Sequence, residues 1–373
     1  MSKIIKLGRN RSLTLTKTRV VDFSTYLGVV LAFLIVNSML NGDMLSRSFR
    51  GQLVPICCYI VMAVSLNLTV GILGELSLGH AGFMSVGAFS GVVAAMSLQS
   101  AVPSEPVRLA IALVTGAACA AIAGVIVGVP VLRLRGDYLA IVTLAFGEII
   151  KELINCLIVG CDENGLHVIF NLDGTKTVSD LGLAEGGIEI IKGAQGATGT
   201  DTIASFTAGF ILIMITLVVV LNLVRSRSGR AIMALRDNRI AAESVGINIT
   251  KYKLMAFITS AALAGAAGAL YGLNFSNLGA TKFNFNTSIL VLVFVVLGGL
   301  GSIWGSIIAA AVLTILPEAL RGFDDYRMLV YAIVLILVML ATNNAQIKAL
   351  FAKALGPVRR LFAKPQKGGA ANG

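Results

Sequence analysis

Residues 225–253 read RSRSGRAIMALRDNRIAAESVGINITKYK, and seven of these side chains are Arg or Lys. Long apolar runs stand on either side of this stretch, at Ile203–Val224 and Leu254–Phe275. Each run is about long enough to cross a hydrocarbon core of roughly 30 Å as a helix. Because basic loops between spans stay on the cytoplasmic side, the pattern predicts a membrane protein with a cytoplasmic loop at 225–253.

The composition independently indicates a membrane protein. Apolar residues make up 56% of the chain and charged residues 13%, whereas soluble domains carry roughly a quarter charged residues. The mean hydropathy is +0.87. A net charge of +11 would suggest a nucleic-acid partner in a soluble protein, but here the cations flank apolar runs. We therefore expect membrane lipid around the chain and no nucleic-acid partner.

The five cysteines lie in or beside apolar runs and show no metal-ligand spacing. We interpret them as small apolar side chains, with a pair between Cys156 and Cys161 as the minor alternative. No metal site is expected.

The hydropathy pattern predicts about ten spans of the usual length. The fold class expected is an all-α polytopic membrane protein with a transmembrane domain over 23–341. Only Gly298-Gly299-Leu300-Gly301-Ser302 separates the eighth span from the ninth, so these two could instead form one broken element. The expected spans are Phe23–Leu40, Gln52–Leu73, Leu78–Leu98, Leu109–Val129, Tyr138–Val159, Ile203–Val224, Leu254–Phe275, Asn286–Gly299, Trp304–Leu320 and Met328–Ala341.

Charge separates the connections between these spans into two sides. The segment 160–202 has seven acidic residues and two lysines. An even number of spans places all basic segments on the other side, so ten spans with both termini cytoplasmic and 160–202 outside satisfy the positive-inside rule. The basic segments are the N-terminal tail 1–22, the connection with Arg133 and Arg135, the loop 225–253 and the C-terminal tail 342–373.

Glycine spacing indicates that the spans pack closely. Small residues let helices approach where no hydrophobic force drives their association. The segment Leu73–Gly82 is different, because it mixes Glu75, Ser77 and His80 with glycines at a junction between spans. Unwound backbone at this depth needs protein or a water-filled cavity beside it, so we expect a substrate pathway there, with an ordinary interfacial turn as the alternative. The recurring glycines are Gly71, Gly74, Gly79, Gly82, Gly87, Gly91, Gly265, Gly268 and Gly272.

Glu148 is a second candidate. If the fifth span begins near Tyr138, Glu148 lies roughly 15 Å along the helix, where a charge is costly and needs a partner. Lys151, three residues later, could pair with it along one face. A structural pair and a pathway-lining carboxylate both remain open. No comparable group occurs in the other spans, which argues against ion-driven transport.

An ordered set of motifs resembles the LivM-type permease of branched-chain amino acid ABC importers, over about residues 55–345. The matching stretches are Leu66-Asn67-Leu68 with Gly71, Leu76–Phe83, Gly87-Ala88-Phe89, Tyr138–Ile149, Gly229–Leu254 with Ala261–Gly265, Val296–Ser302 with Trp304-Gly305, and Leu316-Pro317-Glu318. The candidate residues of a substrate pathway are Asn67, Glu75, Ser77, His80 and Glu148.

The resemblance also implies a role for the loop 225–253. Permeases of ABC importers carry a segment Glu-Ala-Ala-x-x-x-Gly whose short coupling helix seats in a groove of the ATPase subunit. Ala241, Ala242 and Gly246 hold that spacing, and Ile240 replaces the glutamate. The alternative is a basic loop that only faces lipid. Polar contacts to the ATPase subunit are expected from Arg236, Asp237, Arg239 and Glu243.

The chain has no Gly-x-x-x-x-Gly-Lys-Ser/Thr sequence, so ATP and Mg are expected on partner subunits and no cofactor in this chain. The resemblance implies two ATPase subunits, a second permease of the LivH type and an extracytoplasmic solute-binding protein that segment 160–202 could meet. The expected function is import of branched-chain or other apolar amino acids across the bacterial cytoplasmic membrane. Import of urea or short amides and secondary transport are the alternatives. An intramembrane enzyme is not expected, because His80 and His167 are the only histidines.

Overall fold

The computed structural model describes residues 24–42, 46–134, 136–162, 165–171, 175–176, 178–183, 187–320, 329–330, 332–333 and 336. The two basic tails, Arg135 and most of the expected span Met328–Ala341 lie outside the described residues. The chain divides into two units, Met1–Ile315 and Leu316–Gly373. Apart from the last turn of α11, the first unit holds everything that follows.

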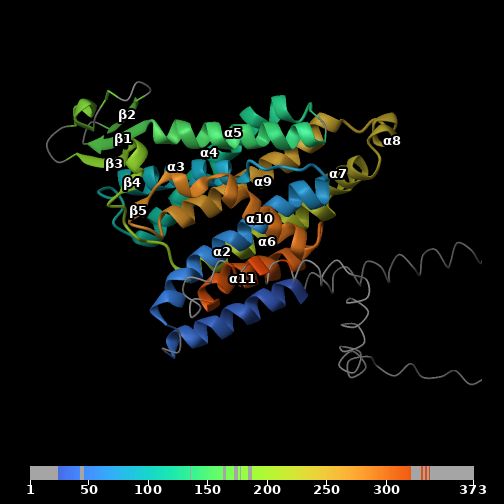
Figure 1. The fold of residues 1–373 in the computed structure, drawn as a ribbon, viewed down its shortest axis with the longest axis horizontal. Helices are drawn as coiled ribbons and strands as arrows, with labels where there is room; N and C mark the ends of the chain where they lie inside the picture. Colours follow the sequence, from blue (N-terminus) through green and yellow to red (C-terminus); the bar gives the residue numbers. More distant parts are fainter. Residues whose placement is uncertain are drawn as a thin grey trace, which may run out of the picture. The chain divides into compact units, whose positions relative to one another are not determined.

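The described part of the first unit is mostly helical (Figure 1). Helices α7 and α8 lie at one end of the bundle, and a small sheet lies at the other. The helices are Ser24–Asn41, α2 Arg47–Asn67, α3 His80–Ser97, α4 Glu105–Val131, α5 Asp137–Asn155, α6 Phe206–Arg225, α7 Arg227–Asp237, α8 Arg239–Ser244, α9 Ile249–Gly272, α10 Phe285–Gly298 and α11 Ile303–Ala319.

Six of the described helices are long and apolar enough to cross a membrane: Ser24–Asn41, α2 with its continuation to Leu73, α3, α4, α6 and α9. Helices α10 and α11 are apolar but have 14 and 17 residues, or roughly 21 and 26 Å at about 1.5 Å per residue. Helix α5 is not among the six. A count of ten spans therefore stays a prediction.

Local sequence explains where several helices begin. The side chains of Ser46, Ser205 and Asn248 accept hydrogen bonds from backbone N–H groups three residues later, at the starts of α2, α6 and α9. Such caps satisfy donors that the first helical turn leaves without a partner. The spans thus begin close to the positions that the apolar runs predict, although α9 begins at Ile249 rather than Leu254.

Helix α2 is the centre of the bundle, since nearly every residue from Leu53 to Asn67 is buried. Glycine contacts join α3 to α9 beside it. A β-carbon on Gly87 would lie 2.0 Å from the carbonyl oxygen of Gly265, and one on Gly268 would lie 1.9 Å from that of Met84. These two helices meet backbone to backbone, which confirms the predicted close packing at these glycines.

A five-stranded antiparallel sheet covers one end of the bundle, with strand order β2-β1-β3-β4-β5. Val159 in β1 pairs with Val168 in β2 and with Ile191 in β3. Short strand β5 comes from the connection between α9 and α10 and pairs with β4. The strands are β1 Leu157–Asp162, β2 Gly165–Phe170, β3 Ile188–Lys192, β4 Ala197–Thr198 and β5 Asn277–Leu278.

The sheet corrects two expectations. The chain is not all-α, and the fifth span does not reach Val159, because α5 ends at Asn155 and Leu157 already belongs to β1. The apolar residues Ile158 and Val159 are buried by pairing within the sheet rather than by a longer helix. Their side chains look the same in a hydropathy plot whether a strand or a helix buries them.

The eighth and ninth expected spans are two separate helices, α10 and α11, joined by a turn at Gly299–Ser302. Gly299 and Gly301 in this turn have φ of 93° and 82°, values that favour glycine. A β-carbon on Gly305 would lie 1.6 Å from the carbonyl oxygen of Gly298. The turn is therefore tight because both helix ends lack side chains there.

Candidate functional site

The loop 225–253 folds into α7, α8 and the first turn of α9. Asn238 lies between α7 and α8. Its side chain caps α8 by accepting a hydrogen bond from the N–H of Ala241 at 3.0 Å. Helix α8 ends before Gly246, whose φ is 83°. The sequence Arg239–Gly246 thus forms one short helix closed by a glycine in a left-handed conformation.

Helix α8 turns one face inward and the other to solvent. Ala242 is buried within the chain, whereas Ile240 is 82% exposed and Val245 is 74% exposed. Ala241 and Glu243 are also on the exposed side. The sequence reasoning missed Ile240 and Val245 as surface residues, although two apolar side chains in an otherwise polar loop could have pointed to them.

Arg236 at the end of α7 has a side chain that is 43% exposed but reaches the backbone of Gly71. Its Nη1 donates a hydrogen bond of 2.8 Å to the carbonyl oxygen of Gly71. Its Nη2 lies 3.3 Å from Oδ1 of Asp237, whose side chain is exposed. Arg239 is the first residue of α8. Arg236 was expected to contact a partner subunit, but its guanidinium is hydrogen-bonded within this chain.

The segment between α2 and α3 is broken, as the sequence predicts. Residues Leu68–Leu73 form a π-helix, Gly74 has φ of 80°, and regular helix resumes only at His80. Neighbouring helices hold the open backbone. The hydroxyl of Thr143 in α5 accepts a hydrogen bond from the N–H of Leu78 at 3.0 Å. Unwound backbone is thereby supported by protein on at least one side.

Three candidate residues in this segment have different surroundings. Glu75 forms an ion pair with Lys253 of α9, and both side chains are largely buried. His80 is buried, and its Nε2 lies 2.8 Å from the Ser65 hydroxyl, which fits a packed structural histidine. The buried hydroxyl of Ser77 is without a hydrogen-bond partner in the described part of the chain. Of these three side chains, Ser77 is the one for which the described residues show no hydrogen bond.

Asn67 is fully buried at the end of α2 and binds the turn between α10 and α11. Its Oδ1 accepts a hydrogen bond from the N–H of Gly301 at 2.8 Å. Its Nδ2 donates to the carbonyl of Ser302 and to the hydroxyl of Ser306, each at 3.0 Å. Asn67 therefore holds the end of α2 against the turn between α10 and α11 and against α11 itself.

Glu148 in α5 is paired on both oxygens. Oε2 forms the expected ion pair with Lys151, and Oε1 accepts a hydrogen bond from the N–H of Phe285 at 3.1 Å, at the start of α10. In the same first turn of α10, the Ser288 hydroxyl accepts from the N–H of Ala81 at 3.1 Å. Glu148 therefore caps α10 and is linked to the start of α3 through that turn.

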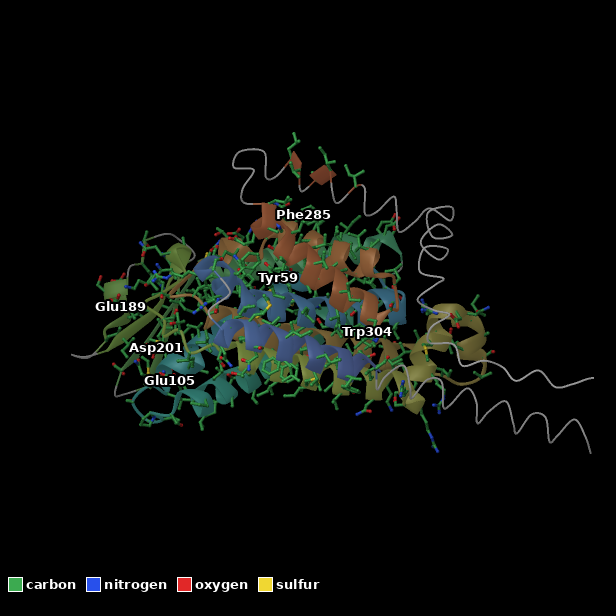
Figure 2. The ribbon with its side chains drawn as sticks, turned by 90° about the horizontal axis from the view of Figure 1, so that it is seen from below. Tyr59, Glu105, Glu189, Asp201, Phe285 and Trp304 are labelled. Atoms are coloured by element: carbon green, nitrogen blue, oxygen red, sulfur yellow. The ribbon has the colours of Figure 1, made fainter. Side chains whose placement is uncertain are left out.

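The sheet end of the molecule carries acidic and apolar side chains. Figure 2 shows Glu105, Glu189 and Asp201 toward the same end of the bundle, and Asp201 pairs with buried Arg108 at 2.9 Å. Three apolar side chains on edge strand β2 are exposed: Leu166, Val168 and Phe170. Cys156 and Cys161 are both free, so the minor alternative of a disulfide is wrong.

Comparison with known proteins identifies the family. The model of a family described as branched-chain amino acid transport system / permease component matches residues 49–339. Two relatives are named high-affinity branched-chain amino acid transport system permease protein LivM, one from Salmonella typhimurium and one from Escherichia coli. Each is 36% identical over 296 residues, which covers 76% of this chain and 66% of the relative.

A further relative has a similar name, high-affinity branched-chain amino acid transport system permease protein LivH. The permease protein LivH from Escherichia coli is 35% identical over 118 residues, covering 31% of this chain and 38% of LivH. No solved structure gives a significant match.

These matches confirm the predicted resemblance to LivM-type permeases and give the urea alternative no support. The matching family is one of transport-system permease components. Apolar helices of spanning length agree with a multi-pass inner-membrane protein. The family match covers well over half of the sequence, and the chain belongs to the family of permease components of branched-chain amino acid transport systems.

Proposed function

We propose that this chain is the permease subunit of an ATP-driven importer of branched-chain or other apolar amino acids. It works with a second, LivH-like permease, two ATPase subunits that hold ATP and Mg, and an extracytoplasmic solute-binding protein. The observation that carries the proposal is the short helix α8, which presents exposed apolar side chains from a basic loop. An ordered helix can transmit a push from a partner, whereas a disordered basic loop could only bind lipid.

Helix α8 is the proposed contact for an ATPase subunit. Ile240 and Val245 form its exposed apolar tip, with Ala241, Glu243 and Gly246 beside them. Short amphipathic helices bind partner proteins by laying apolar residues in a groove. Apolar anchors with a polar rim are the usual composition of such contacts. The replacement of the expected glutamate by Ile240 is then a gain of apolar contact.

The sheet is the proposed contact for the solute-binding protein. It lies at the end of the bundle opposite α7 and α8, so a protein outside and an ATPase inside could act on the same helices. Exposed Leu166, Val168 and Phe170 give β2 an apolar face. The acidic surroundings oppose binding of that face to anionic lipid headgroups, which favours a protein partner.

The substrate pathway is proposed to pass the broken segment 74–79. Ser77 can offer a hydrogen bond to a substrate once the segment opens, because its buried hydroxyl has no partner among the described residues. Asn67, Glu75, His80 and Glu148 build the walls through their contacts with neighbouring helices. Transport then follows from two arrangements of the bundle, which the outer and inner partners favour differently.

The orientation can be tested with single cysteines in a cysteine-free chain. Both termini, the tails 1–22 and 342–373 and the coupling loop 225–253 are proposed to be cytoplasmic, and 160–202 extracytoplasmic, around the membrane domain 23–341. A cysteine at Thr175 should react with an impermeant thiol reagent added to intact cells, and one at Ser228 should react only after lysis. The opposite pattern would invert the proposed topology.

The direct test of the function is purification of the intact complex. An ATPase subunit should co-purify with this chain, and the reconstituted complex should take up a branched-chain amino acid only with ATP inside and the binding protein outside. Uptake without any ATPase subunit would instead indicate a secondary transporter.

Replacing Gly246 with arginine should abolish this uptake. Gly246 has φ of 83° and open space around it, so the substitution adds strain and a bulky charge beside the α8 tip without a clash inside the chain. Gly136→Arg is the matched control, since Gly136 also has positive φ and open space but lies outside the loop 225–253. Equal uptake by both variants would remove the docking role of α8.

A further inference from the structure

The break in α2 lies between the coupling loop 225–253 and the turn Gly299–Ser302. The π-helix Leu68–Leu73 contacts both neighbours, through the side chain of Arg236 in the loop and through the backbone of Gly301 in the turn. Single π-turns inside helices occur frequently at functional sites. The contacts of the π-helix Leu68–Leu73 show which parts of the chain it connects.

The coupling loop reaches the π-helix through Arg236. Besides its hydrogen bond to the Gly71 carbonyl, the arginine packs its aliphatic stem over Gly74, where a β-carbon would lie 2.6 Å from Cγ of Arg236. Gly74 therefore leaves room for the side chain to enter. A guanidinium bound to a backbone carbonyl at 2.8 Å follows that carbonyl when either one moves.

Gly71 also touches the turn between α10 and α11, and a β-carbon on Gly301 would lie 3.5 Å from the Gly71 carbonyl oxygen and 3.9 Å from Nη1 of Arg236. A β-carbon on Gly71 would lie 1.9 Å from Oδ1 of Asn67 and 2.2 Å from the backbone nitrogen of Gly301. Asn67 holds that same Gly301 by a hydrogen bond. A displacement of Gly71 toward this contact meets the backbone of Gly301 and the Asn67 amide, which three hydrogen bonds hold in place, so both must shift.

A second contact joins the same segment to the other side of α8. Lys253 of α9 pairs with Glu75, four residues after Gly71. Arg236 and Lys253 thus come from the two helices that flank α8, and both bind the segment 71–75. The apolar side chains of Leu68 and Ile72 from the π-helix, Ile232 from α7 and Ala256 from α9 share one buried cluster, so these three elements are packed as a unit.

We propose that Arg236 is the positioning residue that transmits movement of the coupling helix α8 to the π-helix and, through Gly71 and Asn67, to the turn between α10 and α11. The proposal rests on the proposed contact of α8 with an ATPase subunit. A purely structural role for Arg236 would require only that it satisfy the Gly71 carbonyl. If Arg236 transmits movement, its loss should lower the amount of substrate taken up per ATP hydrolysed. If its role is only structural, that ratio should not change.

The experiment uses the complete importer in liposomes, with ATP hydrolysis and substrate uptake measured on the same preparation. Arg236→Met should keep the ATPase subunits bound and keep hydrolysis, while the amount of substrate taken up per ATP falls by about ten-fold, within the usual range for coupling between distant sites. Arg236→Lys can still donate one hydrogen bond to the carbonyl and should restore part of the ratio.

Arg230→Met is the matched control. Arg230 is an exposed arginine of the same helix whose Nη1 donates to the carbonyl of Arg225 within the loop, and its replacement should change the ratio by no more than about two-fold. An unchanged ratio in Arg236→Met overturns the proposal, and so does loss of the ATPase subunits from this variant, which would assign Arg236 to docking. Absence of ATPase subunits from the wild-type complex would instead refute the proposed function itself.

Discussion

Replacing Gly268 with alanine should leave little folded protein. The new methyl group would lie 1.9 Å from the Met84 carbonyl oxygen and 3.0 Å from the Ala88 nitrogen, so α3 and α9 must separate. Overpacking of a tight interior costs typically 1–3 kcal/mol, and a clash with the rigid backbone of α3 should cost at least about 3 kcal/mol. The measurement is the unfolding midpoint of the purified chain in detergent.

Gly51→Ala provides the control for the same chemical change. Gly51 lies in α2 with no atom of another residue near its missing β-carbon. Alanine there should stabilise the helix by up to about 1 kcal/mol, because alanine is the better helix former. If both variants unfold at the same midpoint, the close approach of α3 and α9 does not hold in the protein.

Removing Lys253 should have the second large effect. Lys253→Met leaves the carboxylate of Glu75 largely buried and without its cation, and loss of one partner from a buried ion pair costs about 3–5 kcal/mol. The double change Glu75→Gln with Lys253→Met removes both charges and should be much milder. A double-mutant cycle on unfolding free energy measures the coupling between the two side chains directly.

An exposed pair of the same kind gives the reference value. Lys192 and Glu189 lie 2.8 Å apart in the sheet, with both side chains partly exposed. Lys192→Met should cost less than about 1 kcal/mol, since water already screens that pair. Equal losses for Lys192→Met and Lys253→Met would mean that the Glu75 pair is solvated rather than buried.

Much of the helical fold follows from apolar run lengths. Helices α2, α3, α4, α6 and α9 begin and end within a few residues of the runs that predict them, because a bilayer span must satisfy its backbone internally over a fixed length. The sheet does not follow in this way. Its strand β1 continues an apolar run directly from α5, and its strand β5 comes from a separate connection.

The sequence predicted which residues belong to the candidate site, but not which residues they contact. The sequence marks Glu75, Ser77 and His80 as unusual for a membrane segment, yet the ion pair of Glu75 joins it to a residue 178 positions away. Asn67 likewise finds Ser302 across 235 positions. Such pairings depend on which helices become neighbours, and neither hydropathy nor spacing within one helix contains that information. The pair of Glu148 with Lys151 was predictable because it lies within one helix.

The partners of Asn67 also constrain how the protein is made. Ribosomes add about 5–20 residues per second, so Ser302 follows Asn67 after roughly 12–47 s. During that interval α2 holds an amide in hydrocarbon without its final hydrogen bonds, which is costly. We expect nascent α2 to stay beside the insertion machinery until α10 and α11 emerge. A chain interrupted before residue 299 would then expose this amide as a signal for membrane quality-control proteases.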